Sequence, residues 1–145
     1  MSDTKELRVL YVEPGKYPQE IKIPDTLKAL QECVKGYIAA YYPWSNDNAC
    51  VICNDEGKLN GMLPNRQYGK DDYLAGPFLV CGFRGDKLIS LTDKQLSRYE
   101  ELYHSPQIIL DTPFGLYPVK CTPEQYAEQM GENRQPNTEE IEQER

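Results

Sequence analysis

Pro77-Phe78-Leu79-Val80-Cys81-Gly82-Phe83 is the most apolar run of this chain of 145 residues. A short, continuous apolar run is typical of a strand that is buried on both of its faces. We therefore expect residues 77–83 to form the central strand of a sheet, with the rest of the fold built on either side of it.

Two pairs of strands precede this run. Leu7–Val12 is rich in β-forming residues and ends at the turn sequence Glu13-Pro14-Gly15, after which apolar and polar residues alternate over Gln19–Ile23. Tyr37–Tyr42 and Ala49–Asn54 flank a stretch that is dense in turn-forming residues. Each pair predicts a β-hairpin.

A helix is predicted between the two hairpins. It opens at Pro24-Asp25, and Leu27, Leu30 and Val34 then recur at helical spacing. Gly36 stands where a glycine in the left-handed conformation commonly ends a helix. The pattern indicates one amphipathic helix that packs on the sheet.

A second helix is predicted after the central run. Thr92-Asp93-Lys94-Gln95 matches a capping box, in which the threonine and glutamine side chains satisfy free backbone amides at the helix start. Leu96, Tyr99 and Tyr103 form its buried stripe, and it ends near His104. An imidazole at that position suits capping of the last carbonyls, so we expect a structural role for this histidine.

The C-terminal part is expected to be less regular. Gln107–Leu110 predicts a further strand, and Phe114–Val119 is ambiguous because Pro118 would confine it to a sheet edge. A second capping box at Thr122-Pro123-Glu124-Gln125 starts a short helix that Gly131 is expected to stop.

The element order β-β-α-β-β-loop-β-α has short connections, which favour antiparallel pairing. We expect an α+β fold with a mainly antiparallel sheet of about five strands, two main helices and a short C-terminal helix. Residues 1–121 are predicted to form a single domain, residues 122–131 the short helix, and residues 132–145 an acidic disordered tail, since that tail has one apolar residue, Ile141.

The net charge of −7 is concentrated near the C-terminus. From Thr122 to Arg145 seven glutamates face two arginines, a charge of −5, which leaves −2 for the other 121 residues. Direct binding of nucleic acid needs a basic footprint, and so does binding to an anionic membrane. We therefore expect neither partner. A basic protein or a small ligand remains possible, and so does a homo-oligomer.

The thiols and the N-terminus indicate a cytoplasmic protein. The first residues lack the apolar stretch of a signal peptide. The five cysteines cannot all pair with one another, so we expect them to be reduced thiols. Cys50-Val51-Ile52-Cys53 is a CxxC, but in a strand residues three apart point to opposite faces. We expect buried thiols there, with no metal, no redox role and no cofactor.

No motif of a known catalytic mechanism stands in the chain, so no catalytic residue is assigned. Carboxylates are plentiful, and Asp71-Asp72 leaves open a small hydrolase or transferase that uses carboxylates and a divalent metal. That enzyme is the alternative to a binding protein.

Residues 56–72 have no clear period and predict a long loop, and its part from 57 to 70 contains three basic residues and no acid. Forked donors and flexible glycines suit recognition of a carboxylate, a phosphate or a nucleobase edge. We expect Arg66 to anchor the bound group. The predicted site comprises Lys58, Asn60, Gly61, Asn65 and Arg66. The alternative is that these residues form a structural loop, which the Arg66 side chain stabilises by contacts within the protein.

The same loop carries a resemblance. Asn54-Asp55-Glu56-Gly57-Lys58-Leu59-Asn60-Gly61-Met62-Leu63-Pro64-Asn65-Arg66 resembles the signature of an uncharacterised family of small domains, catalogued as domain of unknown function number 3846, from phages, plasmids and genomes of gut Firmicutes. Val12–Pro18, Gly36–Ile38 with Tyr42-Pro43, and Phe78–Gly82 fit its other blocks, so the similarity covers about residues 7 to 104.

The resemblance implies an accessory protein of a mobile genetic element and supplies no reaction. We expect a non-catalytic binding protein that interferes with a host defence system. It would either occupy a basic nucleic-acid site on a host protein or close the 57–70 loop over a small nucleotide-like ligand. A regulatory accessory protein of phage or plasmid replication is a further alternative.

Overall fold

The computed structural model describes residues 5–134, and its core is a six-stranded, fully antiparallel sheet. The strand order is β2-β1-β7-β4-β3, with β8 paired to β7. Its strands are β1 (Glu6–Val12), β2 (Gln19–Pro24), β3 (Ile38–Tyr41), β4 (Ala49–Asn54), β7 (Phe78–Arg84) and β8 (Lys87–Ile89). The α+β class and both predicted hairpins are confirmed, because β1 pairs with β2 and β3 with β4.

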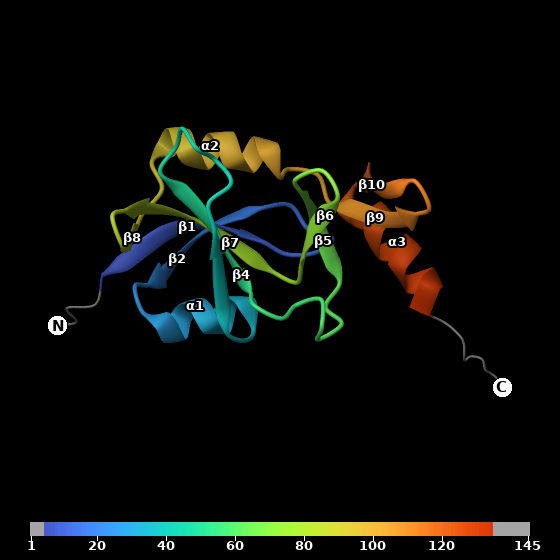
Figure 1. Cartoon of the computed structure of the whole chain (residues 1–145), viewed down its shortest axis with the longest axis horizontal. Coiled ribbons are helices and arrows are strands. Elements are labelled where there is room, and N and C mark those ends of the chain that lie inside the picture. Colours follow the sequence, from blue (N-terminus) through green and yellow to red (C-terminus); the bar gives the residue numbers. More distant parts are fainter. Residues whose placement is uncertain (1–4, 135–145) are drawn as a thin grey trace.

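Strand β7 is central, as the apolar run predicted. It pairs with β1 on one side and with β4 on the other, and its residues 78–81 are fully buried. Phe78 and Val80 face the core under helix α2 (Asp93–Leu102), whereas Leu79 and Cys81 face the core over helix α1 (Leu27–Val34). The sheet is therefore the middle of three layers, with one helix on each face (Figure 1).

Helix α1 begins and ends differently from the prediction. Thr26 caps its start, with its Oγ1 accepting a hydrogen bond from the Ala29 amide at 3.1 Å. The left-handed residue at its end is Lys35, with φ 65°, and not Gly36. Glycine at 36 is needed for space, because a Cβ there would lie 2.7 Å from Nδ2 of Asn54.

Helix α2 confirms the predicted capping box. The Gln95 amide donates to Oγ1 of Thr92 at 3.2 Å, and the Thr92 amide donates to Oε1 of Gln95 at 3.0 Å. Leu96, Tyr99 and Tyr103 are buried against the sheet, as the stripe predicted.

The predicted long loop contains a hairpin that the sequence did not reveal. Strands β5 (Pro64–Tyr68) and β6 (Asp72–Ala75) pair antiparallel, and Gly69 has a φ of 68° in the turn between them. The expectation of irregular structure up to residue 72 was wrong. Strand β5 buries polar side chains, so it lacks the alternation of apolar and polar residues from which a strand is predicted.

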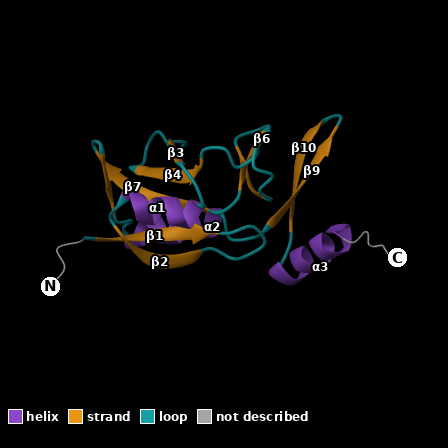
Figure 2. Cartoon of the chain, turned by 90° about the horizontal axis from the view of Figure 1, so that it is seen from below, coloured by secondary structure: helices purple, strands orange, loops and turns teal. Residues whose placement is uncertain are grey.

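A C-terminal unit stands at one end of the molecule (Figures 1 and 2). It comprises the hairpin of β9 (Gln107–Thr112) with β10 (Gly115–Lys120), and helix α3 (Pro123–Arg134). The strand containing Pro118 pairs with β9 alone within residues 5–134, as an edge position requires. Helix α3 starts at the predicted capping box and continues past Gly131, where it was expected to end. Most of the predicted tail, residues 135–145, lies outside the described residues.

Candidate functional site

Two of the predicted site residues are fully buried. Asn65 stands on β5, and its Nδ2 donates to the carbonyls of Val12 and Gly76, both at 2.9 Å. Its Oδ1 accepts a hydrogen bond from Nη1 of Arg66 at 2.8 Å. The asparagine thus joins the β5–β6 hairpin to the end of β1 and has no polar atom left for a ligand.

Arg66 joins two more segments to the hairpin. Its Nε donates to the carbonyl of Tyr103 at the end of α2 at 3.0 Å, and its Nη2 donates to the carbonyl of Lys16 in the β1–β2 turn at 2.7 Å. No carboxylate within the described residues forms an ion pair with it. Burial lowers the pKa of this guanidinium to about 10, and the group is still charged at neutral pH.

The five predicted residues therefore do not form one site. Asn65 and Arg66 brace the hairpin from inside, which corrects the expectation that Arg66 anchors a ligand at the surface. Asn60 and Gly61 lie on the exposed turn that follows β4, and Gly61, with a φ of 71°, has no atom within 4 Å of where a Cβ would stand. Of the five, Lys58 lines an open cavity.

That cavity is an open groove of about 340 Å³ between the end of β3, the turn after β4 and the β5–β6 hairpin. Figure 2 shows β3 and β6 on the same side of the molecule. We call it the tyrosine groove. Its lining comprises three tyrosines, four charged residues and small or apolar residues: Tyr41, Tyr68, Tyr73, Asp55, Glu56, Lys58, Asp72, Cys53, Asn54, Gly57, Leu59, Leu74 and Ala75.

One wall of the tyrosine groove is an aromatic pair. The rings of Tyr41 and Tyr68 lie 5.3 Å apart between centroids and are tilted by 37°, and 40% of the Tyr41 surface is exposed. Burial is the main cause that raises the pKa of both phenols, and nearby Asp72 adds to it. Both rings are therefore neutral at pH 7 and present electron-rich faces without a formal charge.

The same groove already contains a cation of the chain itself, Lys58. Nζ of Lys58 lies 4.6 Å from the centroid of the Tyr73 ring and forms an ion pair with Asp72. The hydrogen bond from Lys58 lowers the pKa of the Asp72 carboxyl, which is thus ionised at neutral pH. An ammonium over an aromatic face with a carboxylate beside it is the usual geometry of a cation-binding pocket.

The charges of the groove favour a positive ligand. Asp55, Glu56 and Asp72 line it against Lys58 alone, a balance of −2. Like charges repel, so a phosphate would be disfavoured there and a guanidinium or ammonium favoured. Sequence reasoning missed the three tyrosines of this site. Their one signal was the count of eleven tyrosines in the chain, a residue that suits pocket walls.

The surroundings of the cysteines and of His104 indicate structural roles. Cys50 faces the core beside α1 and Cys53 the core beside α2, so the two thiols diverge as predicted. All five cysteines are free. Nδ1 of His104 lies 2.9 Å from Oε2 of Glu100, and its ring stacks on Tyr17 at 4.7 Å, so the imidazole meets two side chains and not the helix carbonyls. Residues 5–134 contain no group of three or more side chains suited to hold a metal ion.

A protein-family model matches residues 7–104, and its description is "Domain of unknown function (DUF3846)". The chain belongs to the DUF3846 family. The matched DUF3846 region contains the central sheet from Leu7 onward, α1, α2 and the tyrosine groove, whereas β9, β10 and α3 follow it. Comparison with curated proteins and with solved structures gives no match. Among the described residues, no helix has the length and apolarity needed to cross a membrane.

Proposed function

We propose that this protein is a non-catalytic binding protein whose tyrosine groove receives a cationic side chain of a partner protein. The observation that carries the proposal is the combination of aromatic rings and surplus negative charge in one groove. Lys58 lies over Tyr73 beside Asp72, and the same groove is also lined by the Tyr41–Tyr68 pair and by the exposed residues Asp55 and Glu56. An incoming lysine or arginine finds aromatic faces and negative charge there.

The groove favours this ligand over the nucleotide-like ligand considered from the sequence. That alternative depended on Arg66 and Asn65, which are fully buried, and on a surplus of basic residues. The basic residue that lines the groove is Lys58, and it is already paired with Asp72. A phosphate would meet the other two carboxylates without a free cation to balance it.

We also propose a biological role: the protein is a cytoplasmic accessory protein of a mobile genetic element, and it acts on a host protein. A host protein that binds nucleic acid has a basic face, and an acidic groove is complementary to such a face. Occupation of that face would block the nucleic acid.

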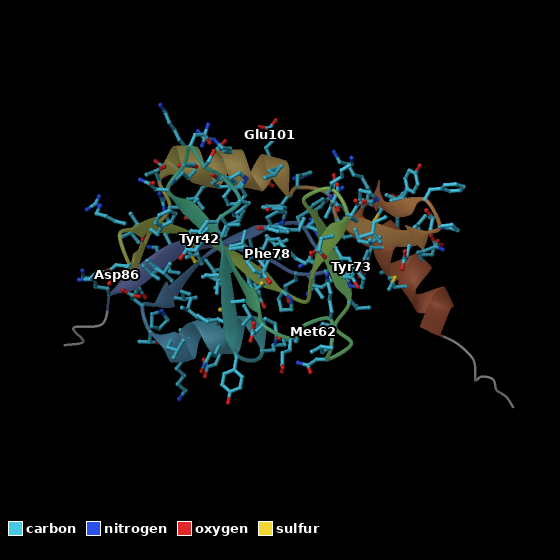
Figure 3. The ribbon with its side chains drawn as sticks, viewed as in Figure 1. Tyr42, Met62, Tyr73, Phe78, Asp86 and Glu101 are labelled. Carbon is cyan, nitrogen blue, oxygen red and sulfur yellow. The ribbon has the colours of Figure 1, made fainter. Side chains whose placement is uncertain are left out.

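Fluorescence anisotropy with a labelled synthetic peptide, acetyl-Thr-Val-Arg-Val-Thr-amide, tests the proposal. The variant Asp55→Asn/Glu56→Gln removes two charges from the groove, and we expect weaker binding and a smaller dependence of binding on salt. The matched control, Asp86→Asn/Glu101→Gln, removes the same charge from sites that lie apart from Tyr73 (Figure 3) and should bind as the wild type does.

Two tyrosine variants complete the test. Tyr41→Ala should lower the affinity by about 2- to 30-fold, the range of a cation–π contact worth about 0.5–2 kcal/mol. Tyr117→Ala removes another exposed ring, from β10, and should leave the affinity unchanged. Adenosine monophosphate that competes with the peptide, or equal losses in both tyrosine variants, would contradict the proposal.

A further inference from the structure

The two edges of the central sheet are protected differently. An edge strand exposes unpaired backbone groups, and proteins normally guard such an edge with charged side chains or proline. Strand β2 follows this rule with exposed Glu20, Lys22 and Pro24. The other edge is β3, and from Tyr37 to Tyr42 it contains neither a charged residue nor a proline.

Strand β3 has a strand partner on one side alone. It pairs with β4 in the register Ile38↔Asn54 to Tyr41↔Val51, and within residues 5–134 no second strand pairs with it. Figure 2 shows β3 at the rim of the sheet. Its outward backbone groups are therefore available for a further strand.

The free edge leads into the tyrosine groove. Tyr41 is the last residue of β3 and lines the tyrosine groove. A chain that pairs with β3 therefore passes beside this groove. Side chains of a strand alternate between its two faces, so a chain paired with β3 can direct one side chain into the groove while its backbone stays on the edge.

We infer that the partner binds as an added strand on β3, as an extended segment of another protein with a basic side chain that enters the tyrosine groove. This inference rests on the proposed function of the groove. A strand of four residues such as β3 offers few backbone hydrogen bonds, so edge pairing alone would be weak and non-selective. The groove adds affinity and selects a basic residue at one position of the segment.

A partner protein fits this surface better than a second copy of this chain. Two copies joined through β3 would bring two acidic grooves close together in a protein whose net charge is −7. A basic segment instead neutralises the carboxylates of Asp55 and Glu56.

Backbone methylation of the peptide tests the inference. Along an edge, alternate residues direct their N–H groups toward the neighbouring strand. Two forms of acetyl-Thr-Val-Arg-Val-Thr-amide are compared, one N-methylated at both valines and one at the arginine. We expect one form to lose at least ten-fold in affinity and the other to bind as the unmodified peptide does. We also expect slower amide hydrogen exchange in β3, and no change in β2, when the unmodified peptide is bound.

The outcomes separate the inference from the function on which it rests. If the two methylated peptides bind equally, or if the groove binds the peptide without protection of the β3 amides, edge pairing is refuted and the proposed function of the groove stands. If the unmodified peptide does not bind, both fail. Protection of β3 that rises with protein concentration in the absence of peptide would assign the edge to a second copy and overturn the choice of partner.

Discussion

Replacement of Arg66 tests whether the most distinctive part of the loop motif is structural. Arg66→Met keeps most of the side-chain volume and removes every donor of the guanidinium. The carbonyl of Tyr103 and Oδ1 of Asn65 then lose donors in a fully buried position, and the carbonyl of Lys16 loses one where water can reach. A buried acceptor left without a partner costs about 1–3 kcal/mol.

Two such acceptors give a loss of about 2–6 kcal/mol, and removal of a desolvated charge offsets part of it. We therefore expect Arg66→Met to lower the free energy of unfolding by about 3 kcal/mol. Arg66→Lys should lose about 2 kcal/mol, because a lysine can reach one or two of the separated carbonyls but not all of them.

Urea denaturation, followed by circular dichroism, measures these changes. Arg84→Met is the matched control, since Arg84 is exposed at the end of β7, and we expect a change within about 0.5 kcal/mol. A loss below about 1 kcal/mol for Arg66→Met, together with weaker ligand binding by the folded variant, would refute the structural role and restore Arg66 as a ligand anchor.

Burial also determines how the thiols react. Buried Cys50, Cys53 and Cys81 should resist a thiol reagent in the native protein, while half-buried Cys33 and Cys121 react; rapid reaction of all five thiols would contradict the packing. In an NMR titration the pKa of the Asp72 carboxyl should lie below its ordinary value and rise in Lys58→Met; the same pKa in both proteins would exclude the ion pair. Burial raises the pKa of the Cys50 and Cys53 thiols to about 11 and of Tyr99 to about 12. The unfolded chain ionises first, so stability should fall from about pH 9 upward, and a midpoint of urea denaturation that stays constant up to pH 11 would disagree.

The strands and helices that could be predicted from the sequence are those whose buried side chains are apolar. Residues 77–83 form a continuous apolar run and do become the central strand β7. The capping box at Thr92 and Gln95 is a local signal, because four neighbouring residues contain all its hydrogen bonds. The opposite faces of Cys50 and Cys53 follow from the two-residue period of a strand alone.

The features that the sequence concealed depend on contacts between distant residues. Arg66 looks like a surface cation until the carbonyls of Lys16 and Tyr103, 50 and 37 positions away, surround it. Tyr41 and Tyr68 meet because β3 and the β5–β6 hairpin fold toward each other, and no spacing in the chain indicates that pairing. Of the five predicted site residues, Lys58 alone lines the groove, and its partner there is Asp72, for which the sequence alone leaves a metal-binding role open.

Binding of a basic segment in the tyrosine groove is tested most directly at the tyrosine rings themselves. NMR spectra of protein labelled with ¹³C in its tyrosine rings are recorded while acetyl-Thr-Val-Arg-Val-Thr-amide is added. We expect the ring signals of Tyr41 and Tyr68 to shift together along one saturating curve, while those of Tyr117 on β10 do not move. Saturable shifts at Tyr117 with unchanged Tyr41 and Tyr68 signals would contradict the assignment of the tyrosine groove as the binding site.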